Sequence, residues 1–321
     1  MTNAHKIHVI WLYTEELEKS LKLDGKYSNV SSEETTKPNS YIVVTPARNE
    51  EKMLPGLAAD MINQSVKPVV WVLADDGSSD KTWLIIKDLE KEFPWIRGVR
   101  LKSNNEKIFA HQRNRENVKK GLELAIEICR KHNYYYRYLA VVDADVRLER
   151  NYFGKIIKAF QSNPRLGVAH GFVYEKGISL KELHESNRTP RGCGQVIRKE
   201  CYEMMGGYQG DTLSNVKAKN RNWQIETFAS IRIFHRRRTG SGKNYYSSHG
   251  KYAYFINYHP INALLTGIYI MAKLSLREGV SYLSGYCGSL VLRQEKIQDD
   301  EIKEYYWNSF LRLLWHLQEK L

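Results

Sequence analysis

The sequence predicts an α/β fold in which a mostly parallel sheet carries helices on both faces. From Tyr41 onward, short apolar runs alternate with stretches of helical periodicity, which is typical of strand-helix-strand units. The runs are apolar at nearly every position, as in strands that are covered on both sides. Because ligands of such sheets bind at the carboxyl ends of the strands, functional residues are expected directly after them.

Composition sets the limits for any function. The chain has 321 residues, so we expect one large domain with appendages. Its 49 Lys and Arg against 36 Asp and Glu give a net charge of +13, which favours an anionic partner such as nucleic acid, a phosphorylated ligand or an acidic lipid surface. Four cysteines without a C-x-x-C pair argue against a disulfide framework or a thiolate zinc site, and they favour a reducing, cytosolic setting.

The elements follow in order along the chain. A short helix and a polar linker precede the sheet, which begins at Tyr41. We predict four strands in the first half of the chain, at Tyr41–Thr45, Val69–Ala74, Ile96–Leu101 and Tyr138–Val142. Apolar residues at helical spacing predict helices around Met53–Met61, Trp83–Phe93, Val118–Cys129 and Tyr152–Phe160, the second of them capped by Ser79 and Asp80. A further strand, Thr227–Phe234, precedes His235.

Polar clusters follow three of these strands. They are PARNEE (Pro46–Glu51), DDGSSD (Asp75–Asp80) and the pair Asp143 and Asp145. Taken alone, DDGSSD is equally typical of a turn with a helix cap, and a lone acidic pair is commonly just solvated. Since the carboxyl ends of parallel strands meet at one edge of a sheet, we expect the three clusters to share one site.

The pair Asp143 and Asp145 suggests a metal site. Two carboxylates separated by one residue after a strand can point into one cavity, where oxygen ligands suit Mg²⁺ or Mn²⁺ shared with a diphosphate. Such a cation would neutralise charge on a departing nucleoside diphosphate. The sequence has neither a G-x-G-x-x-G nor a G-x-x-x-x-G-K-[ST] string, which counts against a dinucleotide enzyme or a P-loop enzyme.

Together, PARNEE, DDGSSD and the D-A-D after an apolar strand resemble family-2 glycosyltransferases, which have the Rossmann-like GT-A fold. The resemblance runs from Tyr41 to about Phe234 and includes Gly192–Gly194, Arg198–Glu200 and Gly206–Tyr208. It implies a catalytic domain at 41–238, with a nucleotide-binding half at about 41–145 and an acceptor half at about 146–238. An N-terminal helix and linker (1–40) would precede it, and a mobile loop with C-terminal amphipathic helices (239–321) would follow.

The resemblance also implies roles for single residues. Base and ribose binding falls to Glu50, Asp75 and Asp76, with the backbone of Pro46, Ala47 and Arg48 beside them. It makes Asp145 a direct metal ligand and places Asp143 near the ribose or a metal-bound water. No Gln-x-x-Arg-Trp string is present, which disfavours a polymerising synthase.

Asp211 is the candidate general base. It stands where the family has a two-acid motif, but here its partner acid is missing, and Asp211 could instead cap the helix that follows. A phosphate acceptor would tolerate a weakened base, because a phosphate oxygen is already anionic. His235 is a further candidate ligand for the metal or the diphosphate, although it could equally be a surface residue of a basic loop. Arg236, Arg237 and Lys243 would belong to a mobile loop that closes over the diphosphate.

The C-terminal region suggests contact with a membrane. Tyrosines stand there beside Lys251, Lys273, Arg277 and Arg293, a combination that suits helices lying flat in a lipid interface. The apolar run Ile261–Leu276 is too short to span a bilayer. Packing on the core or on a second subunit would explain the same pattern, so a homo-oligomer stays open.

The leading hypothesis is therefore a metal-dependent, inverting transferase. It would move a sugar from a UDP- or GDP-sugar to a polyprenyl-phosphate or lipid-linked glycan acceptor, as a peripheral protein at the cytosolic face of the cell membrane. One alternative is a sugar-nucleotide pyrophosphorylase, although PARNEE lacks the glycine-rich loop that such enzymes carry. Another is a non-catalytic basic module for nucleic acid or membrane, although the basic residues are spread through many helices, so we expect no nucleic-acid partner.

Overall fold

The computed structural model describes residues 39–101, 110–237 and 244–309. These residues form two compact units, the first of 39–101 and 114–237, the second of 110–113 and 244–309. The predicted N-terminal helix, most of the linker before Tyr41, the loop Thr239–Gly242 and Lys243 lie outside the described residues.

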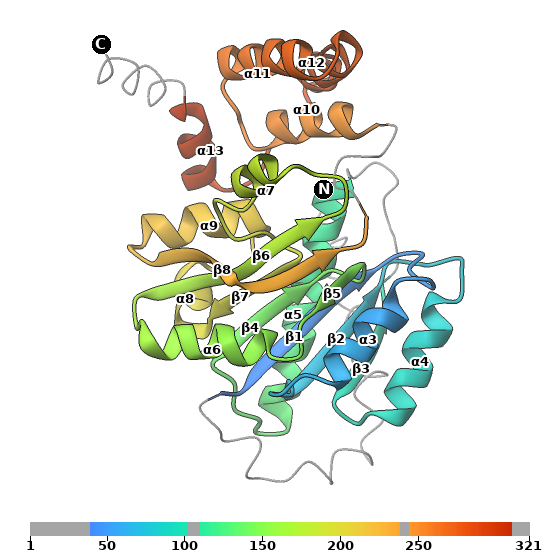
Figure 1. The fold of residues 1–321 in the computed structure, drawn as a ribbon. Helices are drawn as coiled ribbons and strands as arrows, with labels where there is room; N and C mark the ends of the chain where they lie inside the picture. Colours follow the sequence, from blue (N-terminus) through green and yellow to red (C-terminus); the bar gives the residue numbers. More distant parts are fainter. Residues whose placement is uncertain (1–38, 102–109, 238–243, 310–321) are drawn as a thin grey trace, which may run out of the picture. The chain divides into compact units, whose positions relative to one another are not determined.

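The first unit is built on an eight-stranded sheet (Figure 1). Its order is β3-β2-β1-β4-β7-β6-β8-β5. The strands are β1 (Tyr41–Ala47), β2 (Val70–Asp75), β3 (Ile96–Arg100), β4 (Tyr138–Val142), β5 (Val146–Leu148), β6 (Leu166–Glu175), β7 (Gly194–Arg198) and β8 (Gln224–His235).

The half of the sheet formed by β3, β2, β1 and β4 is parallel throughout, which confirms the four strands predicted there. The other half is mixed. Strand β7 runs antiparallel to β4 and β6, β6 runs parallel to β8, and β5 runs antiparallel to β8. Of this half, only the strand before His235 was predicted, since β6 and β7 carry no pattern that separates them from loops.

Helices cover both faces of the sheet, as the apolar strands predict (Figure 1). One face packs against α3, α4 and α6, and the other packs mainly against α5 and α8. The helices of this part of the chain are α3 (Leu54–Ile62), α4 (Thr82–Glu92), α5 (Ala110–Lys131), α6 (Tyr152–Ser162), α7 (Leu180–Ser186), α8 (Lys199–Met204) and α9 (Asp211–Asn220).

The alternation of side chains along β1 explains the two layers. Tyr41 and Val43 belong to the cluster under α3 and α6, whereas Ile42 and Val44 belong to the cluster under α5. All four are fully buried. Burial of each of the aliphatic side chains Ile42, Val43 and Val44 contributes about 1.5–3 kcal/mol. Because successive residues point to opposite faces, β1 holds both layers at once.

The start of α4 differs from the prediction. The helix begins at Thr82 with Lys81 at the N-cap position, so neither Ser79 nor Asp80 is the N-cap residue. Asp80, which directly precedes the N-cap residue, still accepts a hydrogen bond from the backbone N–H of Thr82 at 2.9 Å. The acid therefore satisfies a free N–H of the first turn, as a cap does.

The second unit is helical. It comprises α10 (Tyr245–Phe255), α11 (Pro260–Lys273), α12 (Leu276–Val291) and α13 (Asp300–Trp307). Glycines let these helices approach closely, because a Cβ on Gly285 would overlap the backbone carbonyl of Ser247 in α10, and one on Gly279 would overlap the backbone of α11. Among the described residues, no helix has both the length and the apolar composition needed to cross a membrane.

We predict that Gly285→Ala destabilises the protein, because its methyl group would collide with the backbone of α10, which cannot move aside cheaply. Overpacking of this kind costs about 1–3 kcal/mol. Gly288 lies three residues further along α12, and a Cβ there meets nothing within 4 Å, so Gly288→Ala is the matched control. It should stabilise the helix by up to about 1 kcal/mol. Thermal unfolding followed by circular dichroism would contradict this if both variants shifted the midpoint equally.

Candidate active site

The loops after β1 and β2 are tied together by hydrogen bonds. The backbone N–H of Asn49 donates to Ser78 Oγ at 2.9 Å, and the N–H of Ser79 donates back to Asn49 Oδ1 at 2.9 Å. One residue further on, the N–H of Glu50 donates to Thr82 Oγ1 at 2.7 Å. The loops of PARNEE and DDGSSD therefore form one joined structure at the end of two parallel strands, as expected from their order.

Asn49 holds this junction in a backbone conformation that few residues adopt. Its φ is +56°, in the left-handed region, where asparagine is favoured among residues with a side chain. The same side chain that makes this conformation acceptable also accepts the hydrogen bond from Ser79. The asparagine of PARNEE thus serves the loop geometry.

Asp75 is fully buried, and its carboxylate is used inside the protein. Both of its oxygens accept from the backbone N–H of Ser78, at 3.2 and 3.3 Å, and Arg100 Nε lies 3.1 Å from Oδ2. Asp76 is nearly buried and pairs with Arg48 at 3.0 Å, while its backbone N–H donates to the carbonyl of Ala47. The two acids differ, because Asp75 shapes the turn whereas Asp76 faces an arginine that is partly open to solvent.

A second cluster forms where β4 and β8 end. Ligand atoms of Asp143, Asp145 and His235 lie within 4.8 Å of one another, close enough to hold one metal ion. His235 is the last residue of β8, and its Nε2 lies 3.3 Å from Asp145 Oδ1. Two carboxylates and one imidazole are a donor set that fits a divalent cation such as Mn²⁺ or Mg²⁺.

The protonation of this cluster reflects its crowding. Burial first, and then the neighbouring charge of Asp145, raises the pKa of Asp143 to about 6. Burial alone would lower the pKa of His235, but the hydrogen bond and the charge of Asp145 outweigh it and raise the value to about 9. At neutral pH, His235 therefore carries a proton and a positive charge. A cation that binds to the cluster would displace this proton.

Arg237 connects the two clusters. Its guanidinium forms an ion pair with Glu50 and lies 3.5 Å from Asp145 Oδ2. The preceding residue, Arg236, turns instead toward the start of α3, where it donates to the carbonyl of Met53 at 3.2 Å. The structure thus brings Glu50, Asp145 and Arg237 together and takes Arg236 away from the carboxylates.

The family model for glycosyl transferase family 2 matches residues 42–218, more than half of the chain. The chain belongs to glycosyl transferase family 2. It is therefore a transferase, and the match favours the leading hypothesis over the pyrophosphorylase and the non-catalytic module. No curated protein matches its sequence significantly.

Solved structures of other glycosyltransferases have a similar fold. TarS from S. aureus has 14% sequence identity and a TM-score of 0.50, over 77% of this transferase and 48% of TarS, so the chain spans about half of that protein. A shorter TarS chain in complex with UDP-GlcNAc is similar over 77% of this transferase and 79% of that chain, at 15% identity and a TM-score of 0.50. The mannosyltransferase PcManGT from Pyrobaculum calidifontis, in complex with GDP-Man and Mn²⁺, is similar over 96% of this transferase and 91% of PcManGT. The identity is 12% and the TM-score is 0.50. At these identities the similarity shows the fold, which is GT-A.

Asp211 of the transferase lies at the first position of α9, after Gly210 at the N-cap, so it is not the N-cap residue itself. Its Oδ2 accepts from the backbone N–H of Gly192 at 3.0 Å, and Oδ1 accepts from the N–H of Thr212 at 2.8 Å. Oδ1 also accepts from Thr212 Oγ1 at 3.4 Å, whereas Oδ2 keeps a second lone-pair direction, so these bonds orient the group without exhausting it. Its charge also contributes to the raised pKa of Asp143, which places the two acids near each other.

Arg191 is a residue that the sequence analysis missed. It forms an ion pair with Glu175 at 2.7 Å, and its charge opposes the rise in the pKa of Asp143. Burial lowers the pKa of Arg191, but neighbouring groups, including Cys193, Glu175 and Asp211, raise it overall, so the residue stays charged. It stands directly before Gly192–Gly194, a stretch that the resemblance includes, but the resemblance gives Arg191 no role, and only the fold shows that this loop meets the carboxylates.

We predict that Asp145→Asn weakens Mn²⁺ binding by more than about tenfold, since the amide removes one charged ligand from the cluster. Calorimetric titration of the metal measures this directly. Asp300→Asn is the control, because its side chain is 97% exposed at the start of α13. Equal affinity of the Asp145 variant and the wild type would show that Asp145 does not bind the metal.

Proposed function

We propose that the chain is a metal-dependent, inverting glycosyltransferase. It transfers a sugar from a UDP- or GDP-sugar to a polyprenyl-phosphate or lipid-linked glycan acceptor, as a peripheral protein at the cytosolic face of the cell membrane. The observation that carries this proposal is the cluster of Asp143, Asp145 and His235, joined through Arg237 to the loop after β1.

The donor nucleotide binds at the joined loops after β1 and β2. Glu50 and Asp76 contact the base and ribose, with the backbone of Pro46, Ala47 and Arg48 beside them. Asp75 acts at a distance by holding the turn, because its side chain is fully buried between Ser78 and Arg100. Two solved structures of similar fold hold UDP-GlcNAc and GDP-Man, which supports a nucleotide-sugar donor of either base.

Mn²⁺ or Mg²⁺ is the cofactor. Asp145 and His235 would hold it, with Asp143 beside them near the ribose or a metal-bound water, and it would supply Lewis-acid stabilisation of the leaving diphosphate. The presence of Mn²⁺ in the similar PcManGT structure supports this choice. Arg237 contacts the same diphosphate, because its guanidinium lies beside Asp145, the proposed metal ligand, and beside Glu50 of the nucleotide-binding loop. Lys243 would add a further positive charge from the loop that follows.

Asp211 serves as the general base. The acceptor oxygen attacks the anomeric carbon, the bond from that carbon to the phosphate oxygen breaks, and a hydroxyl acceptor gives its proton to the Asp211 carboxylate. The hydrogen bonds from Gly192 and Thr212 keep this carboxylate in one orientation. A phosphate acceptor has no such proton to lose at neutral pH, so it needs less from Asp211.

The proposed donor chemistry is tested by incubating the full chain with Mn²⁺ and a panel of UDP- and GDP-sugars. We expect nucleoside diphosphate release in the presence of a membrane lipid extract, and loss of that release when the metal is chelated. Thermal shifts with each nucleotide identify the base. If no nucleotide binds, with or without Mn²⁺, the proposed function is wrong.

We predict that Asp211→Asn reduces transfer to hydroxyl acceptors by about 10²–10⁴-fold, the usual contribution of a general base. Transfer to a phosphate acceptor should fall far less. Initial rates with the two acceptor classes and one donor measure the difference. An equal loss with both would assign Asp211 a structural role, because the carboxylate also holds the Gly192 loop.

A further inference from the structure

Helix α11 exposes its largest apolar residues to solvent. Between Ile261 and Ala272 every exposed residue is apolar or aromatic, and no charged residue lies in this stretch. The large side chains among them are 43–61% exposed, namely Ile261, Leu264, Leu265, Ile268 and Tyr269. At 3.6 residues per turn, they lie on one stripe about 140° wide.

The opposite side of α11 carries mostly small and polar residues, with Ile270 as a large apolar residue that packs on the helical core. Asn262, Ala263 and Gly267 are buried, and a Cβ on Gly267 would overlap the side chain of Leu283 in α12. In a helix that packs against a core and faces water, the large apolar residues are buried and the polar ones are exposed. Helix α11 has the reverse arrangement, with small residues at the helix contact, as in helices that pack together within lipid.

Helix α12 also exposes apolar side chains, namely Leu276, Val280, Leu290 and Val291, with Arg277, Ser284 and Cys287 exposed among them. Its residues Gly279, Tyr282, Gly285, Tyr286 and Ser289 are buried. The two helices pack side by side (Figure 1). We call the exposed side chains of Ile261, Leu264, Leu265, Ile268, Tyr269, Leu276, Val280, Leu290 and Val291 the α11–α12 apolar face.

Most of the charges near this face are basic, and Glu295, beyond the end of α12, is the exposed acid that follows them in the chain. Lys273, Arg277 and Arg293 are exposed at the ends of the two helices. The single acid of the helix pair, Glu278, is half-buried and accepts a hydrogen bond from Ser275 Oγ at 3.0 Å. Apolar residues with flanking basic groups complement an anionic lipid surface, where each basic residue contributes about 1 kcal/mol of attraction.

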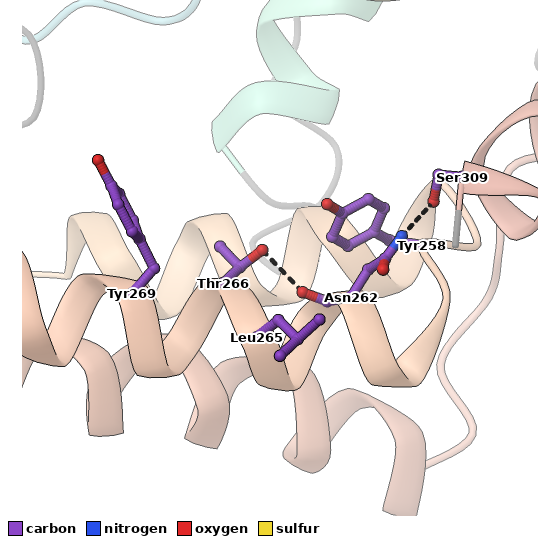
Figure 2. Close-up of a pocket in the computed structure, with 6 residues that line it drawn as sticks. All are labelled: Tyr258, Asn262, Leu265, Thr266, Tyr269 and Ser309. Atoms are coloured by element: carbon purple, nitrogen blue, oxygen red, sulfur yellow. Dashed lines mark hydrogen bonds between the residues drawn. The ribbon is translucent and has the colours of Figure 1, made fainter. Parts of the chain in front are cut away.

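A cavity of about 310 Å³ borders this face (Figure 2). Leu265 and Tyr269 belong to the face and also line the cavity. Its other lining residues are Tyr258, Asn262, Thr266 and Ser309, so hydroxyl groups surround it and no charged side chain lines it among the described residues. Asn262 Nδ2 donates to Ser309 Oγ at 2.7 Å, while the buried Oδ1 of Asn262 has no hydrogen-bond partner in the described part of the chain. This polar margin suits the depth at which lipid carbonyls and headgroups replace acyl chains.

We propose that the α11–α12 apolar face docks on an anionic bilayer, with both helices lying in the plane of the interface. A helix of 14 residues such as α11 is about 21 Å long, shorter than the hydrocarbon core of about 30 Å, which favours this flat orientation. The inference deepens the proposed function, on which it rests for a lipid-linked acceptor. A second copy of the chain is a less suitable occupant, because pairing two such faces would bring exposed basic ends of like sign together.

The test is sedimentation of the full chain with vesicles of phosphatidylcholine alone or with one third phosphatidylglycerol. We expect binding to the anionic vesicles and at least about tenfold weaker binding of the double variant Leu264→Glu and Ile268→Glu. Both side chains are about half exposed, so the substitutions leave the helix contacts intact. Leu84→Glu is the matched control, since Leu84 is 57% exposed on α4 in the first unit, and it should bind as the wild type does.

Three outcomes would overturn the proposal. The first is equal vesicle binding of the double variant and the wild type, and the second is no vesicle binding at all. The third is a dimer in sedimentation velocity for the wild type and the Leu84→Glu control, but a monomer for the double variant. Nucleotide release is measured separately with a water-soluble acceptor. The double variant should keep that activity, whereas Asp145→Asn should lose it and still bind vesicles. Failure of docking and failure of the catalytic proposal are therefore distinguishable.

Discussion

Repulsion among carboxylates at one edge of the sheet is the constraint on which the site depends. Asp143, Asp145 and Asp211 come from the ends of β4 and the start of α9, and the raised pKa of Asp143 records their closeness and burial. Such a group of acids is stable only beside positive charge. The protein supplies it from the second half of the sheet, through Arg191 before β7 and through His235 and Arg237 at the end of β8.

The parallel half of the fold could be predicted from the sequence because its signals are local. A buried parallel strand is apolar at every position, and the polar residues that end it stand next to it in the chain. The rule that parallel strands end at one edge then places PARNEE beside DDGSSD, and the hydrogen bonds between Asn49, Ser78 and Ser79 confirm this contact. The roles of single residues in ligand binding stay predictions.

The mixed half could not be predicted, because antiparallel pairing between distant segments leaves no local pattern. Strand β7 lies between β4 and β6, and this placement brings Arg191 to the carboxylates. Likewise, the sequence shows that Ile261–Leu276 is apolar but not which side faces outward. The glycines of α11 and α12 decide that, since only small residues permit the close approach of the helices and leave the large side chains outside.

The ion pairs of Arg237 with Glu50 and Asp145 give the site an internal counterion. In the proposed donor site, a diphosphate would have to compete for this guanidinium with the carboxylates of Glu50 and Asp145. The apparent affinity for the donor is then the difference between two electrostatic attractions of similar kind, and ionic strength should change it less than the charge of a diphosphate suggests. At this site, the two ion pairs would thereby limit the binding of other phosphates, which the net charge of +13 favours.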